Sequence, residues 1–257
     1  MAKIQRIANV PPQQILLLVV ALIGACTTAT VSAPKPSALQ LETLVPGSAM
    51  HGVHGLAFDA DDNLFGASLT GYSIYQIDTQ SGEVTVAVEP PLGNSDDVAV
   101  GPDGTLAWTA GAFSAVLAKT PDGEIRVLAE NLPGINSINY SPDGRLFATR
   151  VFAGDALYEI DTEGVNPARE IARKLGGLNG FEIIADNRLY GPLFFKSKVV
   201  QVDLATGQVA DVADDFTVPA AVNIDSRNNL YVVDIRSGEV TRINLDSGDR
   251  HIIATLQ

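Results

Sequence analysis

The stretch NSINYSPDGRLFAT, residues 136–149, decides the fold of this chain because close variants of it occur five times. Its first half is a polar start followed by alternating residues. The turn Ser141-Pro142-Asp143-Gly144 then leads into a second alternating run. Alternating residues bounded by such turns predict short β-strands. The stretch is therefore a candidate β-hairpin, and its repetition determines the architecture.

Four further stretches align with this one, at a period of about 42 residues. They are HGLAFDADDNLFGA from His54, DDVAVGPDGTLAWT from Asp96, NGFEIIADNRLYGP from Asn179 and AAVNIDSRNNLYVV from Ala220. Each copy is followed by a second pair of strand-like runs, so each unit holds about four strands. Such units are typical of β-propeller blades, because one four-stranded sheet cannot cover both its faces and must stack on its neighbours. The sequence predicts an all-β propeller; a two-sheet sandwich, the alternative, would not need the repeat.

The strand count predicts a propeller of the six-bladed type with about five complete blades. Residues 39–45 have the pattern of the fourth strand of a blade, and five complete units follow them. The sixth blade is therefore expected to be incomplete. Either the chain is cut short before the remaining strands of that blade, or five blades close with one stray strand. An open ring would leave sheet edges that invite association.

The first 25 of the 257 residues are expected to be a signal peptide. Lys3 and Arg6 precede an apolar run over residues 15–24, which is the layout of a secretory signal and is too short to span a bilayer. Residues 23–26, Ile-Gly-Ala-Cys, resemble the bacterial lipoprotein signal, which implies that Cys26 becomes a lipidated first residue. An ordinary signal peptide with an incidental cysteine is the alternative.

The predicted organisation and location follow from this start. Residues 26–38 are rich in Thr, Ala, Ser and Pro and predict a flexible tether, and residues 39–257 form the propeller domain. The expected location is the bacterial cell envelope, with the protein exported and lipid-anchored at the outer membrane or cell surface. A net charge of -13 lacks the basic footprint of a nucleic-acid binder. The single cysteine excludes an internal disulfide and a multi-cysteine metal site.

The residues that open the repeats are candidates for a shared site. The innermost strand of every propeller blade starts at one mouth of the central channel, so these opening residues converge there. Oxygen ligands arriving from several directions suit a hard cation such as Ca²⁺, which could polarise a carbonyl oxygen. Asn and Asp also start strands by bonding to nearby backbone, and that structural alternative stays open. The converging residues are His54, Asp96, Asn136, Asn179 and Ala220.

At these residues the sequence resembles the senescence-marker protein/gluconolactonase family, which includes regucalcin. More distantly it resembles diisopropylfluorophosphatase and the paraoxonases. The resemblance covers about residues 39–257 and implies a six-bladed propeller that holds Ca²⁺ or another divalent cation at the channel mouth and acts as a lactonase or phosphotriesterase. The matching segments are Val53-His54-Gly55, Asp96-Asp97, Ile135-Asn136-Ser137 and Leu178-Asn179-Gly180. The resemblance thereby implies Asp96, Asn136, Asn179 and His54 as metal ligands.

The chain departs from the ligand pattern of this family, which is glutamate, asparagine, asparagine and aspartate. Only Asp96 brings a formal negative charge, where the family has two, so we expect a weak site, a different ion or none. Asn179 stands at the family's candidate base or nucleophile and can take neither role. His54 or His51 could instead act as general base, with Asp97 orienting it. Loop histidines without a partner are the alternative.

Two functions remain open from the sequence. One is a metal-dependent hydrolase of lactones or esters at the channel mouth. The other is a non-catalytic, membrane-tethered propeller that binds a small molecule or a protein partner there. Phe194 and Phe195 are expected to pack between blades, with a position lining a ligand mouth as the alternative.

Overall fold

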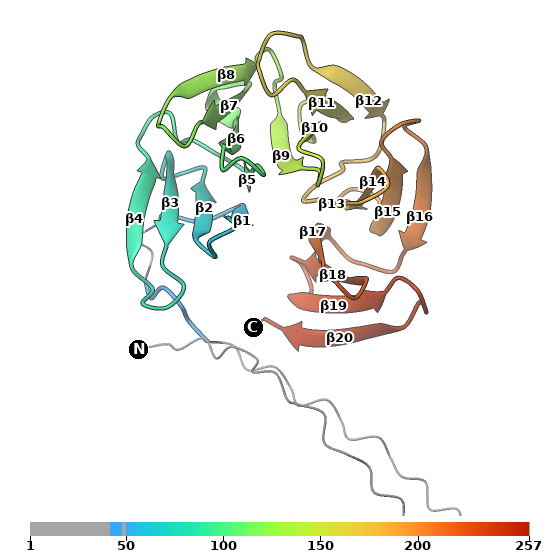
Figure 1. The fold of residues 1–257 in the computed structure, drawn as a ribbon. Helices are drawn as coiled ribbons and strands as arrows, with labels where there is room; N and C mark the ends of the chain where they lie inside the picture. Colours follow the sequence, from blue (N-terminus) through green and yellow to red (C-terminus); the bar gives the residue numbers. More distant parts are fainter. Residues whose placement is uncertain (1–41, 48–49, 257) are drawn as a thin grey trace, which may run out of the picture.

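The computed structural model of the chain describes residues 42–47 and 50–256. The predicted signal peptide, Cys26 and the predicted tether lie outside the described residues. The described part forms twenty strands in five four-stranded antiparallel sheets. Figure 1 shows these sheets as five blades around a common centre, in an incomplete ring. Within this part of the chain, no helix has the length and apolarity needed to cross a membrane.

Each blade consists of four strands that are consecutive in the sequence and paired in that order. Blade one contains β1 (Leu56–Phe58), β2 (Leu64–Ser68), β3 (Ser73–Ile77) and β4 (Val84–Val88). Blade two contains β5 (Val98–Val100), β6 (Leu106–Ala110), β7 (Ala115–Lys119) and β8 (Ile125–Ala129), with the 3-10 helix η1 (Gly111–Phe113) between β6 and β7. Blade three contains β9 (Ile135–Tyr140), β10 (Leu146–Arg150), β11 (Ala156–Ile160) and β12 (Arg169–Arg173). Blade four contains β13 (Glu182–Ile184), β14 (Arg188–Leu193), β15 (Lys198–Asp203) and β16 (Val209–Ala213). Blade five contains β17 (Pro219–Ile224), β18 (Asn229–Asp234), β19 (Glu239–Asn244) and β20 (Arg250–Thr255).

The turn between the first two strands of every blade has a positive φ at the same repeat position, eight residues after the repeat starts. Glycine adopts this left-handed conformation without steric cost, and Asn and Asp tolerate it better than other residues. The chain uses only these three types there, which is why the turn chemistry recurs with the repeat. The residues are Asp62 (φ 64), Gly104 (φ 83), Gly144 (φ 85), Asn187 (φ 59) and Asn228 (φ 57).

The hydrophobic core lies between blades. Among the described residues there are four buried apolar clusters, and each joins one pair of consecutive blades. Val98 of blade two, for example, packs with Ala67 and Ile74 of blade one. Phe181 of blade four packs with Phe147 and Leu157 of blade three. The remaining two clusters join blades two and three and blades four and five. The fold therefore depends on blade stacking, as the repeat predicted.

The sector between blade five and blade one is open (Figure 1). At its outer side, Leu44 lies against the β3–β4 turn, where a Cβ on Gly82 would approach the Leu44 carbonyl oxygen to 2.5 Å. The corresponding glycine of blade three, Gly164, would approach the carbonyl oxygen of Val127 to 2.6 Å. Since Val127 belongs to β8, the outermost strand of the preceding blade, Leu44 occupies the equivalent position before blade one. The prediction of an all-β propeller with five complete blades is confirmed, and the sixth blade stays a prediction.

Candidate functional site

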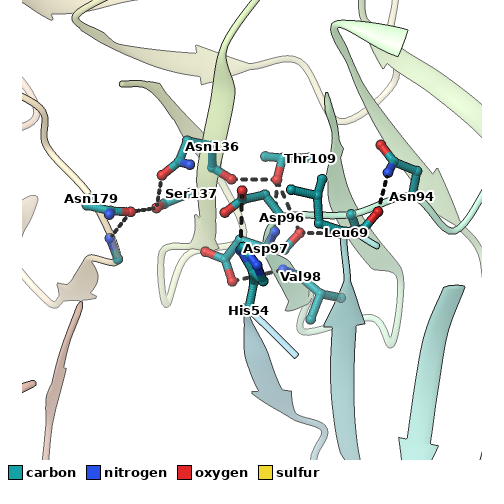
Figure 2. A network of polar contacts seen from close by, with 12 residues as sticks. His54, Leu69, Asn94, Asp96, Asp97, Val98, Thr109, Asn136, Ser137 and Asn179 are labelled. Atoms are coloured by element: carbon teal, nitrogen blue, oxygen red, sulfur yellow. Dashed lines mark hydrogen bonds and ion pairs between the residues drawn. The ribbon is translucent and has the colours of Figure 1, made fainter. Parts of the chain in front are cut away.

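The repeat register brings the predicted ring residues to one mouth of the channel. The innermost strands β1, β5, β9, β13 and β17 pack beside one another around the centre. His54 and Asp96 each lie two residues before an innermost strand, and Asn179 lies three residues before one. Asn136 is the second residue of β9. Figure 2 shows these four residues in one polar network, in which Thr109 joins the His54–Asp96 pair to the Asn136–Ser137–Asn179 group through the Asp96 and Asn136 backbone. The fifth repeat contributes the apolar Ala220.

His54 and Asp96 form a pair across blades one and two. His54 Nδ1 lies 3.6 Å from Asp96 Oδ2, and the two side chains are 47% and 24% exposed (Figure 2). Burial raises the pKa of Asp96 above its usual value, and the neighbouring imidazole opposes this rise. The contact between the two side chains is longer than a hydrogen bond, so it is an electrostatic one and does not by itself select the tautomer of His54. His51, the other candidate base, is exposed on a loop with φ 52.

The two asparagines of the ring converge on one serine hydroxyl. Ser137 Oγ lies 2.8 Å from Asn179 Oδ1 and 3.2 Å from Asn136 Oδ1, and it can donate its single proton to only one of them (Figure 2). Asn136 is only 4% exposed, and its backbone carbonyl accepts a hydrogen bond from Thr109 of blade two. Sequence reasoning missed Ser137, although its position directly after Asn136 is also the position of Asp97 after Asp96.

Asp97 connects blades rather than facing a histidine. Its Oδ1 accepts a hydrogen bond from Val98 N at 2.9 Å, and its Oδ2 accepts one from Ile138 N of blade three at 3.0 Å. A Cβ on Gly55 of blade one would lie 2.1 Å from Asp97 Oδ1, so glycine is required there. Burial raises the pKa of Asp97 to about 7, with a smaller contribution from Asp96, against the lowering effect of the two N–H donors.

The position beside His54 that the sequence assigned to Asp97 is therefore taken by Asp96. The contacts of the Asp97 carboxylate are with backbone N–H groups of β5 and β9. The contact with Ile138 N fixes the peptide that carries Asp96 against blade three. We accordingly describe Asp97 as a positioning residue and Asp96 as the partner of His54.

A second polar level lies three residues further along the innermost strands. Glu182 Oε2 accepts hydrogen bonds from Asn139 Nδ2 at 3.4 Å and from Asn223 Nδ2 at 3.3 Å. Burial raises the pKa of Glu182, and hydrogen bonds from Ile183 N and Asn139 lower it. Glu182 and Asn223 hold the same repeat position, three residues after Asn179 and Ala220. Asn139 was missed, although it follows Asn136 at the same spacing of three.

The donors at the mouth suit a hard cation in chemical type but bring little charge. Two amide oxygens and one carboxylate are oxygen ligands, and an imidazole completes the set of Asp96, Asn136, Asn179 and His54. The described residues include no group of three or more His, Cys, Asp and Glu side chains placed to hold a metal. By chemical type these donors are mostly neutral, and Asp96 is the single formal negative charge among them.

A separate pocket of about 400 Å³ lies at the other end of the blades, among the turns that join first and second strands. Its lining includes Pro102 and Asp103 from blade two and Pro142 and Asp143 from blade three. None of the ring residues takes part in it. The ring residues His54 and Asp96 lie at the opposite mouth.

Comparison with known proteins supports the fold. No family model matches the sequence, and no curated protein matches it. A chain of a nidogen/laminin complex is similar at 24% identity and TM-score 0.69, over 77% of this chain and 78% of that chain. A gluconolactonase from Xanthomonas campestris matches at 18% identity and TM-score 0.67, over 83% and 79%. A streptogramin B lyase matches at 16% identity and TM-score 0.65, over 80% and 70%. At these identities the likeness establishes a shared fold and nothing about activity.

Proposed function

We propose that this protein is a metal-dependent hydrolase of lactones or esters, with its reaction centre at the channel mouth. The observation that carries the proposal is the convergence of His54, Asp96, Asn136 and Asn179 from four consecutive blades on one polar network. A gluconolactonase among the structural neighbours is in keeping with this reading. Asp96, Asn136 and Asn179 would hold Ca²⁺ or another divalent cation, and His54 either completes the ligand set or acts as the base.

The chain's own groups account for the proton transfers of such a reaction. A cation bound at the mouth would supply polarisation of the substrate carbonyl. Asp96, 3.6 Å from His54 Nδ1, would stabilise the imidazolium, and His54 Nε2 would take a proton from an attacking water. The water oxygen bonds to the carbonyl carbon, the C–O bond to the alkoxy group breaks, and the proton on His54 passes to the leaving alkoxide. Water is consumed; an ester gives an acid and an alcohol, and a lactone gives one hydroxy acid.

Two measurements on the purified protein test this proposal. The melting temperature should rise with one of Ca²⁺, Mg²⁺ or Mn²⁺ and fall with chelator, because a ligand that binds only the folded state stabilises it. A pH-stat assay on a lactone and ester panel should then show that His54→Ala lowers kcat by about 10²-fold or more. His251→Ala, an exposed histidine on β20, is the matched control and should retain activity. Absence of both a thermal shift and hydrolysis contradicts the proposal.

A second candidate function is a non-catalytic propeller that binds a small molecule or a protein partner at the same mouth. Two observations favour it over catalysis: only one carboxylate belongs to the ring, and Asn179 can serve neither as base nor as nucleophile. A structural neighbour that belongs to a nidogen/laminin complex is in keeping with a binding role. Saturable binding of a lactone without turnover, with or without a cation, would favour this candidate.

We further propose that the ring has the spacing of a six-bladed propeller. Support comes from Leu44, which sits against Gly82 as Val127 sits against Gly164. Thiol accessibility in a Cys26→Ser background tests the open sector. Leu56→Cys should react rapidly with a maleimide, while Val98→Cys, at the same repeat position in blade two, should react slowly. Equal protection of the two thiols would mean that five blades close on one another, contrary to the proposal.

For residues 1–38 we propose export, lipidation of Cys26 and a tether that holds the propeller away from a bacterial membrane. The support is the sequence pattern around Ile23-Gly24-Ala25-Cys26. Cells grown with labelled palmitate should incorporate label into the wild type and not into Cys26→Ser. Label in both proteins, or in neither, contradicts the lipid anchor.

A further inference from the structure

The mouth that carries the polar network also carries a rim of exposed apolar side chains. All of them lie in the loop between the second and third strands of a blade, and these loops end at the mouth where the innermost strands begin. Large apolar side chains normally avoid water, and a gathering of them on one face marks an interaction site. The rim residues are Tyr72 (45% exposed), Phe113 (45%), Phe152 (66%), Phe195 (59%) and Ile235 (59%).

Three phenylalanine rings meet at one point of this rim, between blades three and four. Phe152 lies 5.8 Å from both Phe194 and Phe195 between ring centroids, and Phe194 lies 5.2 Å from Phe195. All three pairs are edge-to-face, the arrangement that aromatic quadrupoles favour. The sequence reading expected Phe194 and Phe195 to pack between blades; the structure adds Phe152 to them and leaves two of the three rings largely exposed.

The aromatic cluster is built onto the backbone that leads to Asn179. Phe194 N donates to Gly177 O at 2.8 Å, and Phe195 N donates to Gly176 O at 3.1 Å. A Cβ on Gly177 would lie 2.6 Å from the Phe195 ring, so glycine is required at this contact. Gly177 precedes Asn179 by two residues. The position of the rings and that of a ring ligand are therefore set by one short segment.

The loop of blade three is fixed to the same segment. The Asp155 carboxylate accepts hydrogen bonds from Gly176 N at 2.9 Å and from Gly177 N at 3.1 Å. Arg150 holds the other side of this loop by donating to the carbonyl oxygens of Pro133, at 2.7 Å, and of Ala153, at 2.5 Å. Phe152 lies between Arg150 and Asp155. Exposed rings held by so many backbone contacts form a rigid surface, which is the kind that binds a ligand at low entropic cost.

We propose that the cluster of Phe152, Phe194 and Phe195 is the subsite for an aromatic substituent of the substrate that reacts at the channel mouth. The inference rests on the proposed function, because it assigns the substrate class of that same site. A phenyl group on an ester or lactone can add a further edge-to-face contact to the exposed rings while its carbonyl reaches the polar network. Arg150, Asp155 and Lys196 stand within three residues of these rings in the sequence, so charges of both signs lie near the cluster and a neutral ring suits it.

Binding of unreactive analogues tests the subsite independently of catalysis. Calorimetry compares an unsubstituted γ-lactam with its phenyl-substituted derivative on the purified protein. The wild type should bind the phenyl derivative about tenfold more tightly, and Phe152→Ala and Phe195→Ala should each remove most of that preference. Both side chains are exposed, so folding should be retained. Phe113→Ala, an exposed phenylalanine on the same rim in blade two, is the matched control and should keep the preference.

The possible outcomes separate this inference from the proposed function. Phenyl preference that depends on Phe152, without hydrolysis of the matching lactones, supports the subsite and contradicts the hydrolase. Equal affinity of the wild type for both lactams overturns the subsite, as does an equal loss of preference in Phe113→Ala. A last experiment measures binding to phosphatidylglycerol vesicles. If the vesicles bind the wild type but not the Phe152→Ala/Phe195→Ala double variant, and the lactam preference is absent, the cluster is a membrane contact. That result overturns the proposal.

Discussion

At one repeat position all five blades carry an apolar residue, but its exposure to solvent is very different in blade one from that in the other four blades. The position two residues after the start of each repeat holds Leu56, Val98, Ile138, Phe181 and Val222. The last four are 2%, 3%, 4% and 8% exposed, because each packs on the preceding blade. Leu56 is 59% exposed, since no blade precedes it in the described part of the chain.

The difference shows that burial in this fold belongs to the junction between blades and not to the blade itself. β1 pairs with β2 as its counterparts do, so strand pairing alone does not cover Leu56. A substitution at a closed junction should therefore lower the free energy of unfolding more than a substitution that faces the open sector. The same logic applies to polar residues, because Asp97 and Ser137 also act across junctions. Four substitutions probe this contrast.

The largest effect is expected at a closed junction. Phe181→Ala removes a ring that packs against Phe147 and Leu157 of blade three, and large-to-small changes of this kind cost about 3–5 kcal/mol. Urea unfolding followed by circular dichroism measures the loss. Phe152→Ala is the matched control, because its ring is 66% exposed, and it should cost less than about 1 kcal/mol. Equal losses would show that junction burial does not dominate stability.

A second effect concerns pH, through the enclosed Asp97 carboxyl. Its pKa is about 7 in the folded protein and about 3.9 in an unfolded chain, so the folded state holds the proton more tightly. The stabilisation is complete below pH 4 and is lost as the pH rises to 7, by about 2–4 kcal/mol once partial exposure is taken into account. Denaturant unfolding at several pH values, in chelator, measures this slope.

Asp97→Asn is the variant that isolates the titration. It removes the ionisable group, so the fall in stability between pH 4 and 7 should become shallower. Loss of the carboxylate oxygen can also change stability, but by the same amount at every pH. Asp96 also has a raised pKa and contributes with the same sign, so some slope should remain. An unchanged slope in Asp97→Asn would show that this carboxyl titrates as an ordinary aspartate.

Sequence reasoning reached the fold because the deciding features are local and repeated. The five copies of the hairpin, each with Gly, Asn or Asp at the left-handed turn position, specify a blade without any knowledge of distant contacts. The same register placed His54, Asp96, Asn136 and Asn179 at one mouth. The strand predicted over residues 39–45 does not form in its described part, residues 42–45, although Leu44 lies against Gly82 as Val127 of β8 lies against Gly164.

What the sequence could not provide was the direction of each side chain. Asp96 and Asp97 are adjacent and chemically identical, yet one faces His54 and the other crosses to Ile138 N. That choice depends on the missing side chain of Gly55, which belongs to another blade. The meeting of Phe152 with Phe194 and Phe195 likewise joins loops about 40 residues apart, which only the packing of consecutive blades brings together.

A smaller effect is expected at a polar contact across a junction. Ser137→Ala removes the hydroxyl that links blade three to Asn179 of blade four, and the loss of one such hydrogen bond costs about 1 kcal/mol. Ser73→Ala is a suitable control, because Ser73 is also buried but its Oγ donates to Gly71 O within blade one. Binding of Ca²⁺ should weaken only in Ser137→Ala if the asparagines are ligands. Equal cation affinity in both variants would remove Asn136 and Asn179 from the ligand set.

The smallest effect on stability is expected at Leu56, the exposed position of blade one. Leu56→Ala should change the free energy of unfolding by less than about 0.5 kcal/mol, because the side chain already lies in water. The equivalent change at Ile138, which is 3% exposed, should cost about 2–5 kcal/mol. Chemical denaturation of the two variants at low protein concentration gives the comparison directly. A loss of several kcal/mol at Leu56 would mean that the sector is filled in solution, and that the junction before blade one is closed like the others.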